Sequence, residues 1–385
     1  MKINTTTALD YCEFVTDGTH DSPKAKDEGF KLITSKHLKR YEIDFNSANF
    51  ISEEDYKKVI DRSSVEQWDI LFSMIGTIGN LYIETNSNIN YACKNMGIFQ
   101  MGGDEMKSKW LYYYLQSPKA VEYIAAVSRG TTQGYVPLGA LRKMPVDVVE
   151  NIVRDKIVTF LWNLDEKIKT NIEINNNLEQ QAQAIYQQMF IDNPDHDWIE
   201  GSLSDIANIT MGQSPSGSSY NEDGIGAIFF QGRAEFGFRF PTIRLYTTEP
   251  KRMAYANDIL MSVRAPVGDL NVAHNDCCIG RGLAAIRSKT NHQSFVLYTM
   301  FSLKKQLDVF NGEGTVFGSI NRNSLNDMPI LIPDDEQIEK FELIVAPMDA
   351  AIRNNYDEIC RLQAVRDSLL PRLMSGELDV SNIGL

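Results

Sequence analysis

Residues 161–189 read LWNLDEKIKTNIEINNNLEQQAQAIYQQM, and residues 345–373 read VAPMDAAIRNNYDEICRLQAVRDSLLPRL. In both stretches, interface residues recur at alternating steps of three and four, which places one residue from each turn on a single seam. The first seam is Leu161, Leu164, Ile168, Asn171, Asn175, Leu178, Ala182, Ile185 and Met189. The second is Val345, Met348, Ile352, Asn355, Ile359, Leu362, Arg366, Leu369 and Leu373, which matches the first at an offset of 184. We therefore predict two long helices that pair with each other.

The repeat continues outside the helices. The segment Asp69–Ser73 (DILFS) recurs as Asp258–Ser262 (DILMS), and Met144-Pro145-Val146 recurs as Met328-Pro329-Ile330. The chain is thus predicted to be a duplicated unit, in which a globular domain precedes a long helix. We place the domains at 1–146 and 197–333, and the helical segments at 147–196 and 334–385. The expected fold class is α+β, with two mixed α/β domains joined by paired helices.

Composition is that of an ordinary globular protein. Of the 385 residues, 43% are hydrophobic and 23% are charged. A chain of this length can form two globular domains of roughly 100–200 residues each. No apolar run approaches the roughly 20 residues of a membrane span, and the start lacks the apolar core of a signal peptide. We therefore expect a cytoplasmic protein without membrane contact. The five cysteines include no C-x-x-C pair, so we expect reduced thiols and no metal site.

The net charge of -13 is concentrated in the predicted helices. Residues 1–146 hold 17 Lys+Arg and 18 Asp+Glu, and residues 197–333 hold 12 and 13. The helical segments hold 4 and 9 (147–196) and 5 and 11 (334–385). Each globular domain is therefore almost neutral and can present one basic face to nucleic acid. The acidic helices should face solvent or a partner protein.

Polar loops with cationic and amide side chains are the candidate binding segments. In the first domain, a turn-rich stretch with Lys24 precedes a basic run, and a second polar loop follows near residue 130. In the second domain, a Ser/Gly-rich loop and the segment 229–237 match this pattern. Guanidinium and amide groups suit phosphates and base edges, although a solvated surface is the alternative interpretation. The candidate DNA contacts are Lys24, Lys36, His37, Arg40, Gln133, Ser214, Gln231 and Arg233.

Catalytic motifs are missing from the sequence. It contains no G-x-G-x-x-G opening a helix, no Walker motif, no H-E-x-x-H and no Asn/Asp-Pro-Pro-aromatic tetrad, and its five histidines are scattered. Three functions compete: a DNA-reading subunit, a coiled-coil scaffold that does not bind DNA, and an enzyme that uses both domains as one site. The scaffold leaves the polar loops without a role, and the enzyme lacks residues for its chemistry. DNA binding that weakens steeply with salt separates the first two.

Several motifs together carry a family resemblance. They are Asp17-Gly18-Thr19-His20, the two Asp-Ile-Leu-x-Ser segments, Gly130-Thr131-Thr132-Gln133, Leu178–Tyr186, Arg264–Gly268, Cys278–Gly282 and Leu369–Leu378. In this order and largely in duplicate, they resemble the specificity subunit of a type I restriction-modification system, across essentially the full length. One departure is Gly314-Thr315-Val316-Phe317, which lacks the Thr-Gln of the first copy, so a DNA role of Gln133 does not extend to Phe317.

The resemblance implies a division of labour. Each domain would be a target recognition domain that reads one half of a bipartite site in double-stranded DNA. The two helices would pair antiparallel as a coiled coil about a pseudo-twofold axis, and we expect Asn171 and Asn355 to meet near its middle. Two modification subunits would dock on the helices and bring S-adenosylmethionine for N6-adenine methylation. Restriction subunits would bring ATP and Mg²⁺, so the chain itself needs no cofactor and has no catalytic residues.

Overall fold

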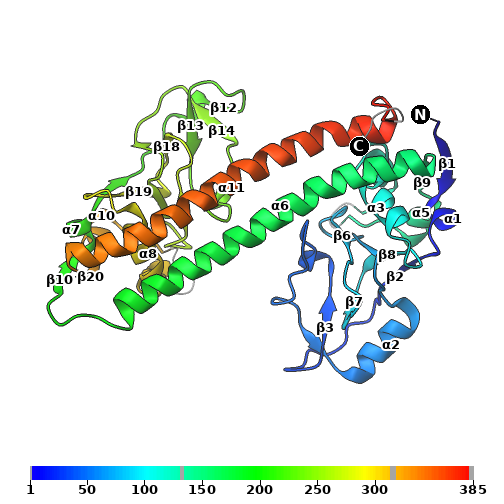
Figure 1. The fold of residues 1–385 in the computed structure, drawn as a ribbon, viewed down its shortest axis with the longest axis horizontal. Helices are drawn as coiled ribbons and strands as arrows, with labels where there is room; N and C mark the ends of the chain where they lie inside the picture. The colour runs from blue at the N-terminus through cyan, green and yellow to red at the C-terminus, as the bar shows by residue number, and fades with distance from the viewer. Residues whose placement is uncertain (1, 131–133, 313–317, 381–385) are drawn as a thin grey trace. The chain divides into compact units, whose positions relative to one another are not determined.

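The computed structural model describes residues 2–130, 134–312 and 318–380. The chain forms two compact units, of which the first comprises Met1–Asn171 and Asp357–Leu385 and the second Ile172–Tyr356. Two long helices, α6 (Asn151–Tyr186) and α11 (Asp335–Ser375), contribute to both units (Figure 1).

Three small sheets build the first unit. The strands are β1 (Asn4–Thr7), β2 (Phe14–Asp17), β3 (Phe30–Ile33), β4 (Phe50–Ile51), β5 (Ile70–Ser73), β6 (Leu81–Ile83), β7 (Tyr91–Cys93), β8 (Met96–Gln100) and β9 (Pro145–Val148). Strands β1 and β9 pair antiparallel, and β2-β8-β5-β6 form an antiparallel sheet. In the third sheet, β4-β3-β7, the pair β3–β7 is parallel.

Helices pack the core of the first unit. They are α1 (Ala8–Tyr11), the 3-10 turn η1 (Ser35–His37), α2 (Glu53–Ser63), α3 (Glu105–Tyr114), α4 (Pro118–Val127) and α5 (Leu138–Lys143). The side chain of Asp104 caps α3, and Ser117 caps α4, whose first residue is Pro118. Helix α3 is buried around most of its circumference, and Trp110 donates from Nε1 to the Asp147 carbonyl at 2.8 Å.

The second unit has the same three kinds of sheet. Its strands are β10 (Ile199–Ser202), β11 (Ala207–Met211), β12 (Tyr220–Asn221), β13 (Ala227–Phe230), β14 (Leu245–Thr247), β15 (Met253–Ala254), β16 (Ile259–Ser262), β17 (Leu270–Val272), β18 (Cys277–Ile279), β19 (Leu283–Ser288) and β20 (Pro329–Ile332). The sheets are β10-β20, β11-β19-β16-β17 and β12-β14-β13-β18-β15, and β13–β18 is again the parallel pair.

The helices of the second unit enclose an aromatic core. They are α7 (Leu203–Ile206), η3 (Gly217–Ser219), η4 (Arg233–Glu235), α8 (Gln293–Ser302), α9 (Lys304–Asp308), η5 (Val309–Asn311) and α10 (Arg322–Asn326). Tyr186, Phe190, Phe295 and Phe341 contact one another with ring centroids 5.1–6.4 Å apart. These contacts fasten the domain to the long helices, because Tyr186 and Phe341 belong to α6 and α11.

The order of elements is therefore duplicated. Strands β2, β3, β5, β6, β7 and β8 of the first unit correspond to β11, β13, β16, β17, β18 and β19 of the second, and α3 corresponds to α8. The predicted α+β class with an internal repeat is confirmed. Helix α6 begins later than residue 147, because Pro145–Val148 forms strand β9 against β1. At its far end α6 continues into the π-helical turn η2 (Gln187–Ile191).

The predicted seam residues lie in the interior. Ile168, Asn171 and Ile352 are buried, whereas Leu164, Leu178, Ile185, Met348, Asn355, Leu362 and Leu369 are half-buried. In the first unit Asn171 Nδ2 donates to Glu358 at 2.7 Å, and in the second Asn355 Nδ2 donates to Asn175 Oδ1 at 2.9 Å. In the first unit the order of contacts is Asp165 with Arg366 and then Asn171 with Glu358, and in the second it is Asn175 with Asn355 and then Tyr186 with Phe341. Because later residues of α6 meet earlier residues of α11, the helices run antiparallel within each unit.

The matched asparagines bond residues of their own units, Asn171 to Glu358 and Asn355 to Asn175. In the first unit, Arg366 pairs with Asp165 at 2.6 Å. Asn171 lies six residues after Asp165 on α6. Because the helices are antiparallel, its partner on α11 must lie about as many residues before Arg366, which is close to Glu358 rather than Asn355. Asn355 instead meets Asn175, one turn further along α6.

In the part of the chain that the structure describes, no helix is both long and apolar enough to span a membrane.

Candidate nucleic-acid interface

A basic cleft opens on the first unit. Its volume is about 880 Å³, and it lies between the residues that follow β3, the loop that joins β5 to β6, and the turn at Asn95. Lys36, Lys39 and Arg40 line it, and its lining includes no carboxylate. All three cations are exposed, and 45% of the Arg40 side chain is open to solvent. Such a concave cationic surface attracts a polyanion.

The 3-10 turn η1 directs the lysines outward by burying the histidine between them. His37 is only 2% exposed, and its Nδ1 accepts a hydrogen bond from the Thr34 backbone N–H at 2.9 Å. Burial, with the nearby Lys36 charge, lowers the pKa of His37, so the ring is neutral at pH 7. The prediction that His37 contacts DNA is therefore corrected: this ring caps the turn that carries Lys36.

The opposite wall of the cleft is the loop between β5 and β6. Gly79 adopts a φ of +94°, which L side chains rarely tolerate, and this allows its N–H to bond the Ser73 carbonyl at 3.1 Å. Asn80 Nδ2 donates to the Leu38 carbonyl at 3.2 Å, which ties this loop to the basic segment. The two walls are thus held together without filling the space between them.

The corresponding strand ends of the second unit also carry cations and amides. Gln231 follows β13 directly, and a Cβ at Gly280 would lie 2.8 Å from the Gln231 Cα, so the turn between β18 and β19 packs against it. Within that turn, the backbone N–H of Arg281 donates to Ser214 Oγ at 3.1 Å. Ser214 and Gln231 therefore flank the same turn, although they are 17 residues apart in the sequence.

Arg233 lies in η4, which corresponds to η1. It is exposed and pairs with Asp269 at the end of the loop between β16 and β17. That loop corresponds to the β5–β6 loop, and it also presents the exposed Arg264. Both units therefore place an exposed cation on the 3-10 turn that follows the corresponding strands β3 and β13, Lys36 in the first and Arg233 in the second.

Two candidates do not join these groups. Lys24 is exposed but does not line the cleft, and Gln133 lies outside the described residues. The predicted DNA contacts did not include Lys39, Arg264 and Arg281, which lie beside these groups. Lys39 belongs to the same basic run as Lys36. Arg281 lies between two glycines, a pattern typical of a tight turn, and this pattern could have identified it from the sequence.

Among the described residues, cationic, amide and hydroxyl side chains line the cleft rather than carboxylates or a histidine. Among the residues that the structure describes, no three His, Cys, Asp or Glu side chains are grouped so that they could hold a metal ion. The thiols of Cys12, Cys93 and Cys277 are buried, and burial raises the pKa of each, to about 12 for Cys12 and Cys277, which keeps them protonated.

Comparison with known proteins identifies the family. The profile of the type I restriction modification DNA specificity domain matches this chain twice, at residues 24–180 and 195–355. The chain belongs to this family. It is thus a DNA specificity subunit of a type I restriction-modification system, a recognition subunit rather than a catalytic one.

Individual relatives agree with this assignment. The specificity subunit is 28% identical over 96% of its length to the putative type I restriction enzyme MjaX specificity subunit of Methanocaldococcus jannaschii, of which 92% is covered. It is 21% identical to the HindI specificity subunit of Haemophilus influenzae, over 82% of this chain and 88% of that one. The crystal structure of a type I system S subunit from M. genitalium shares the fold, with a TM-score of 0.60 at 16% identity, covering 97% and 96% of the two chains.

Proposed function

We propose that the basic cleft of the first unit and the corresponding turns of the second each read one half of a bipartite DNA site. The observation that carries this proposal is that an exposed cation stands on the 3-10 turn after the equivalent strands β3 and β13: Lys36 in η1 of the first unit and Arg233 in η4 of the second. A charge distribution that serves only solubility has no reason to repeat at these turns.

The side-chain chemistry suggests two kinds of contact. Lys36 and Arg40 are assigned to phosphates, because they are exposed cations that line the cleft, and Lys24 is assigned to a phosphate as an exposed cation outside it. Gln231, Arg233 and Ser214 are assigned to base edges, because amide and guanidinium groups bond adenine and guanine in pairs. Gln133 keeps the same assignment on the strength of its sequence context alone.

We further propose the division at 1–146, 147–196, 197–333 and 334–385 as recognition domain and helix in alternation. The acidic helices present exposed apolar side chains, of which Leu343 is 75% and Ile344 51% exposed. Modification subunits would dock there, with restriction subunits joining them, and these partners would bind S-adenosylmethionine, ATP and Mg²⁺. Such a complex would work in the cytoplasm, where the cell's DNA is accessible.

The phosphate contacts are tested by salt dependence. DNA binding by the assembled modification complex is measured by fluorescence anisotropy at several salt concentrations, for wild type, Lys36→Ala and Arg40→Ala. Each variant should lower the affinity for all sequences alike and reduce the slope of log K against log salt by about one. Lys57→Ala is the matched control, because Lys57 is 66% exposed on α2 and pairs with Glu53 outside the cleft. Unchanged slopes in both cleft variants would show that DNA binds elsewhere.

A further inference from the structure

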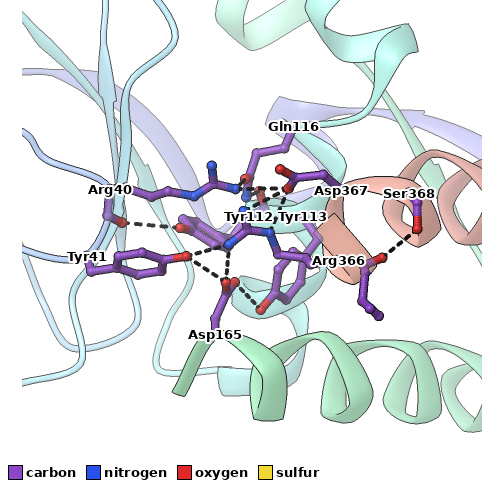
Figure 2. Close-up of polar contacts among 10 residues, drawn as sticks. Arg40, Tyr41, Tyr112, Tyr113, Gln116, Asp165, Arg366, Asp367 and Ser368 are labelled. Atoms are coloured by element: carbon purple, nitrogen blue, oxygen red, sulfur yellow. Dashed lines mark hydrogen bonds and ion pairs between the residues drawn. The ribbon is translucent and has the colours of Figure 1, made fainter. Parts of the chain in front are cut away.

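A buried carboxylate joins helix and domain in the first unit. Asp165 of α6 is 7% exposed and accepts hydrogen bonds from Tyr41 Oη at 3.0 Å and from Tyr113 Oη at 2.8 Å (Figure 2). Arg366 of α11 pairs with the same carboxylate at 2.6 Å and also donates to Tyr41 Oη. The Arg366 side chain is fully buried. The helices therefore supply both Asp165 and its counter-ion, and the domain offers Asp165 only neutral hydroxyls; its Arg40 reaches Asp367, beside Arg366, at 3.6 Å.

In the second unit, the buried cation belongs to the domain rather than to a long helix. Asp349 of α11 accepts from Tyr298 Oη at 3.0 Å and pairs with Arg239 Nη1 at 3.1 Å. Arg239 belongs to the domain, is 4% exposed, and also pairs through Nη2 with Glu179 of α6 at 2.9 Å. Here the helices supply two carboxylates, and the domain supplies the cation.

The participants occupy equivalent positions of the repeat. Asp165 and Asp349 are 184 residues apart, and at the same offset Gln363 corresponds to Glu179 and Arg366 to Ala182. Tyr41 follows the end of η1 by four residues, and Arg239 follows the end of η4 by four. A change from Tyr to Arg in the domain thus accompanies a change from Arg to Ala in the helix.

We propose that the helices carry two electrostatically distinct seats that discriminate between domains. The first seat, formed by Asp165 and Arg366, accepts a domain with a neutral hydroxyl donor at the position of Tyr41. The second seat, formed by Asp349, Glu179 and Ala182, accepts a domain with a cation at the position of Arg239. Each recognition domain is thereby confined to its own end of the helical pair, which fixes the order in which the half-sites are read.

The physical cause is the cost of a buried charge without a partner. A domain with arginine on the first seat would bring a second guanidinium to Asp165, beside the buried Arg366. A domain with tyrosine on the second seat would leave Asp349 and Glu179 without a counter-ion, and removing one member of a buried ion pair is strongly destabilising. Burial already raises the pKa of Glu179 above its usual range, while the Arg239 charge opposes that rise.

A double-mutant cycle on the first seat tests the proposal. Tyr41→Arg and Arg366→Ala should each lower the melting temperature of the full chain, by roughly 5–15 °C. The double variant transfers the cation from helix to domain, so it should melt closer to wild type than either single variant does. If the losses of the two single variants simply add, the proposal is overturned, because the two positions then do not share one charge.

The second seat provides an independent test, in which no substituted side chain is larger than the original one. Arg239→Met removes the cation at nearly constant length and should lower the melting temperature, whereas adding Glu179→Gln should recover part of that loss. Arg244→Met is the matched control, since Arg244 is 58% exposed in the same domain, and it should shift melting by only a few degrees at most. A double variant no more stable than Arg239→Met would contradict the proposal for this seat.

Discussion

At the scale of single residues, equivalent acids of the two units are neutralised differently. Asp258 pairs with Arg287 Nε at 2.6 Å, whereas Asp69 accepts only the backbone N–H groups of Glu66 and Met101, both at 2.9 Å. The strand position of Arg287 is occupied in the first unit by Gln100, which bonds the Ser64 carbonyl instead. Burial consequently raises the pKa of Asp69 to about 6.

This difference predicts a pH dependence of the first unit. Because the pKa of Asp69 is higher in the folded than in the unfolded chain, the folded state holds the proton more tightly. The resulting stability is fully present below about pH 4 and is lost as pH rises through 6, amounting to about 3 kcal/mol. Urea denaturation between pH 4 and pH 8 should therefore show a shallower decline in the free energy of unfolding for Asp69→Asn than for wild type. An identical pH profile in the two proteins would refute the raised pKa.

His37 and Arg40 show what residue-level reading of the sequence can and cannot supply. Both stand in one basic run, and composition alone cannot distinguish them. The turn η1 buries His37 as a cap for Thr34, whereas Arg40 remains in the cleft. That separation depends on the tertiary packing of β3 against β7, which no local pattern encodes.

At the scale of elements, hydrophobic periodicity was sufficient to locate both long helices and their seams, because spacing alone fixes which residues share a helical face. It could not supply the register between them. The register depends on side chains such as Arg366 and Asp165, which meet only after folding. The short strands β3 and β7, which position the cleft, are equally hard to predict, because each has only three or four residues.

The register between the helices shows where both can be lengthened without disturbing their pairing. Since Asn171 meets Glu358 and Asn175 meets Asn355, residues near 172 lie opposite residues near 356. Inserting one heptad after Ile172 and one after Tyr356 keeps the seam and adds about 10.5 Å to each helix. At about 3.4 Å per base pair, the unread spacer between the half-sites should widen by roughly three base pairs.

The readout for the lengthened helices is methylome sequencing of cells that express the variant with its modification subunit. A single insertion in α6 alone is the control, because it leaves seven residues unpaired and should impair assembly. A doubly lengthened protein that assembles and methylates DNA with the original spacer would show that the helices do not set the distance.

At the scale of the whole molecule, duplication is the feature that organises the chain. Repeat offsets in the sequence predicted two equivalent units, and both units share the four-stranded antiparallel sheet, a parallel pair (β3–β7 and β13–β18) and a tyrosine–aspartate contact with a long helix. The repeat is imperfect where it matters for function. The residues around the cations of η1 and η4 and the buried charges of the seats differ between the copies, so the two units are alike in fold and distinct in side-chain chemistry.

The most direct test of the central claim, that each unit reads its own half-site, is methylome mapping of the double variant Gln231→Ala, Arg233→Ala beside wild type. Both changes lie in the second unit, and each lost base contact should cost roughly 1–3 kcal/mol of discrimination. We predict relaxed sequence preference in one half-site, with the other half-site and the spacer unchanged. Altered preference in both half-sites, or in neither, would contradict the assignment of one half-site to each unit.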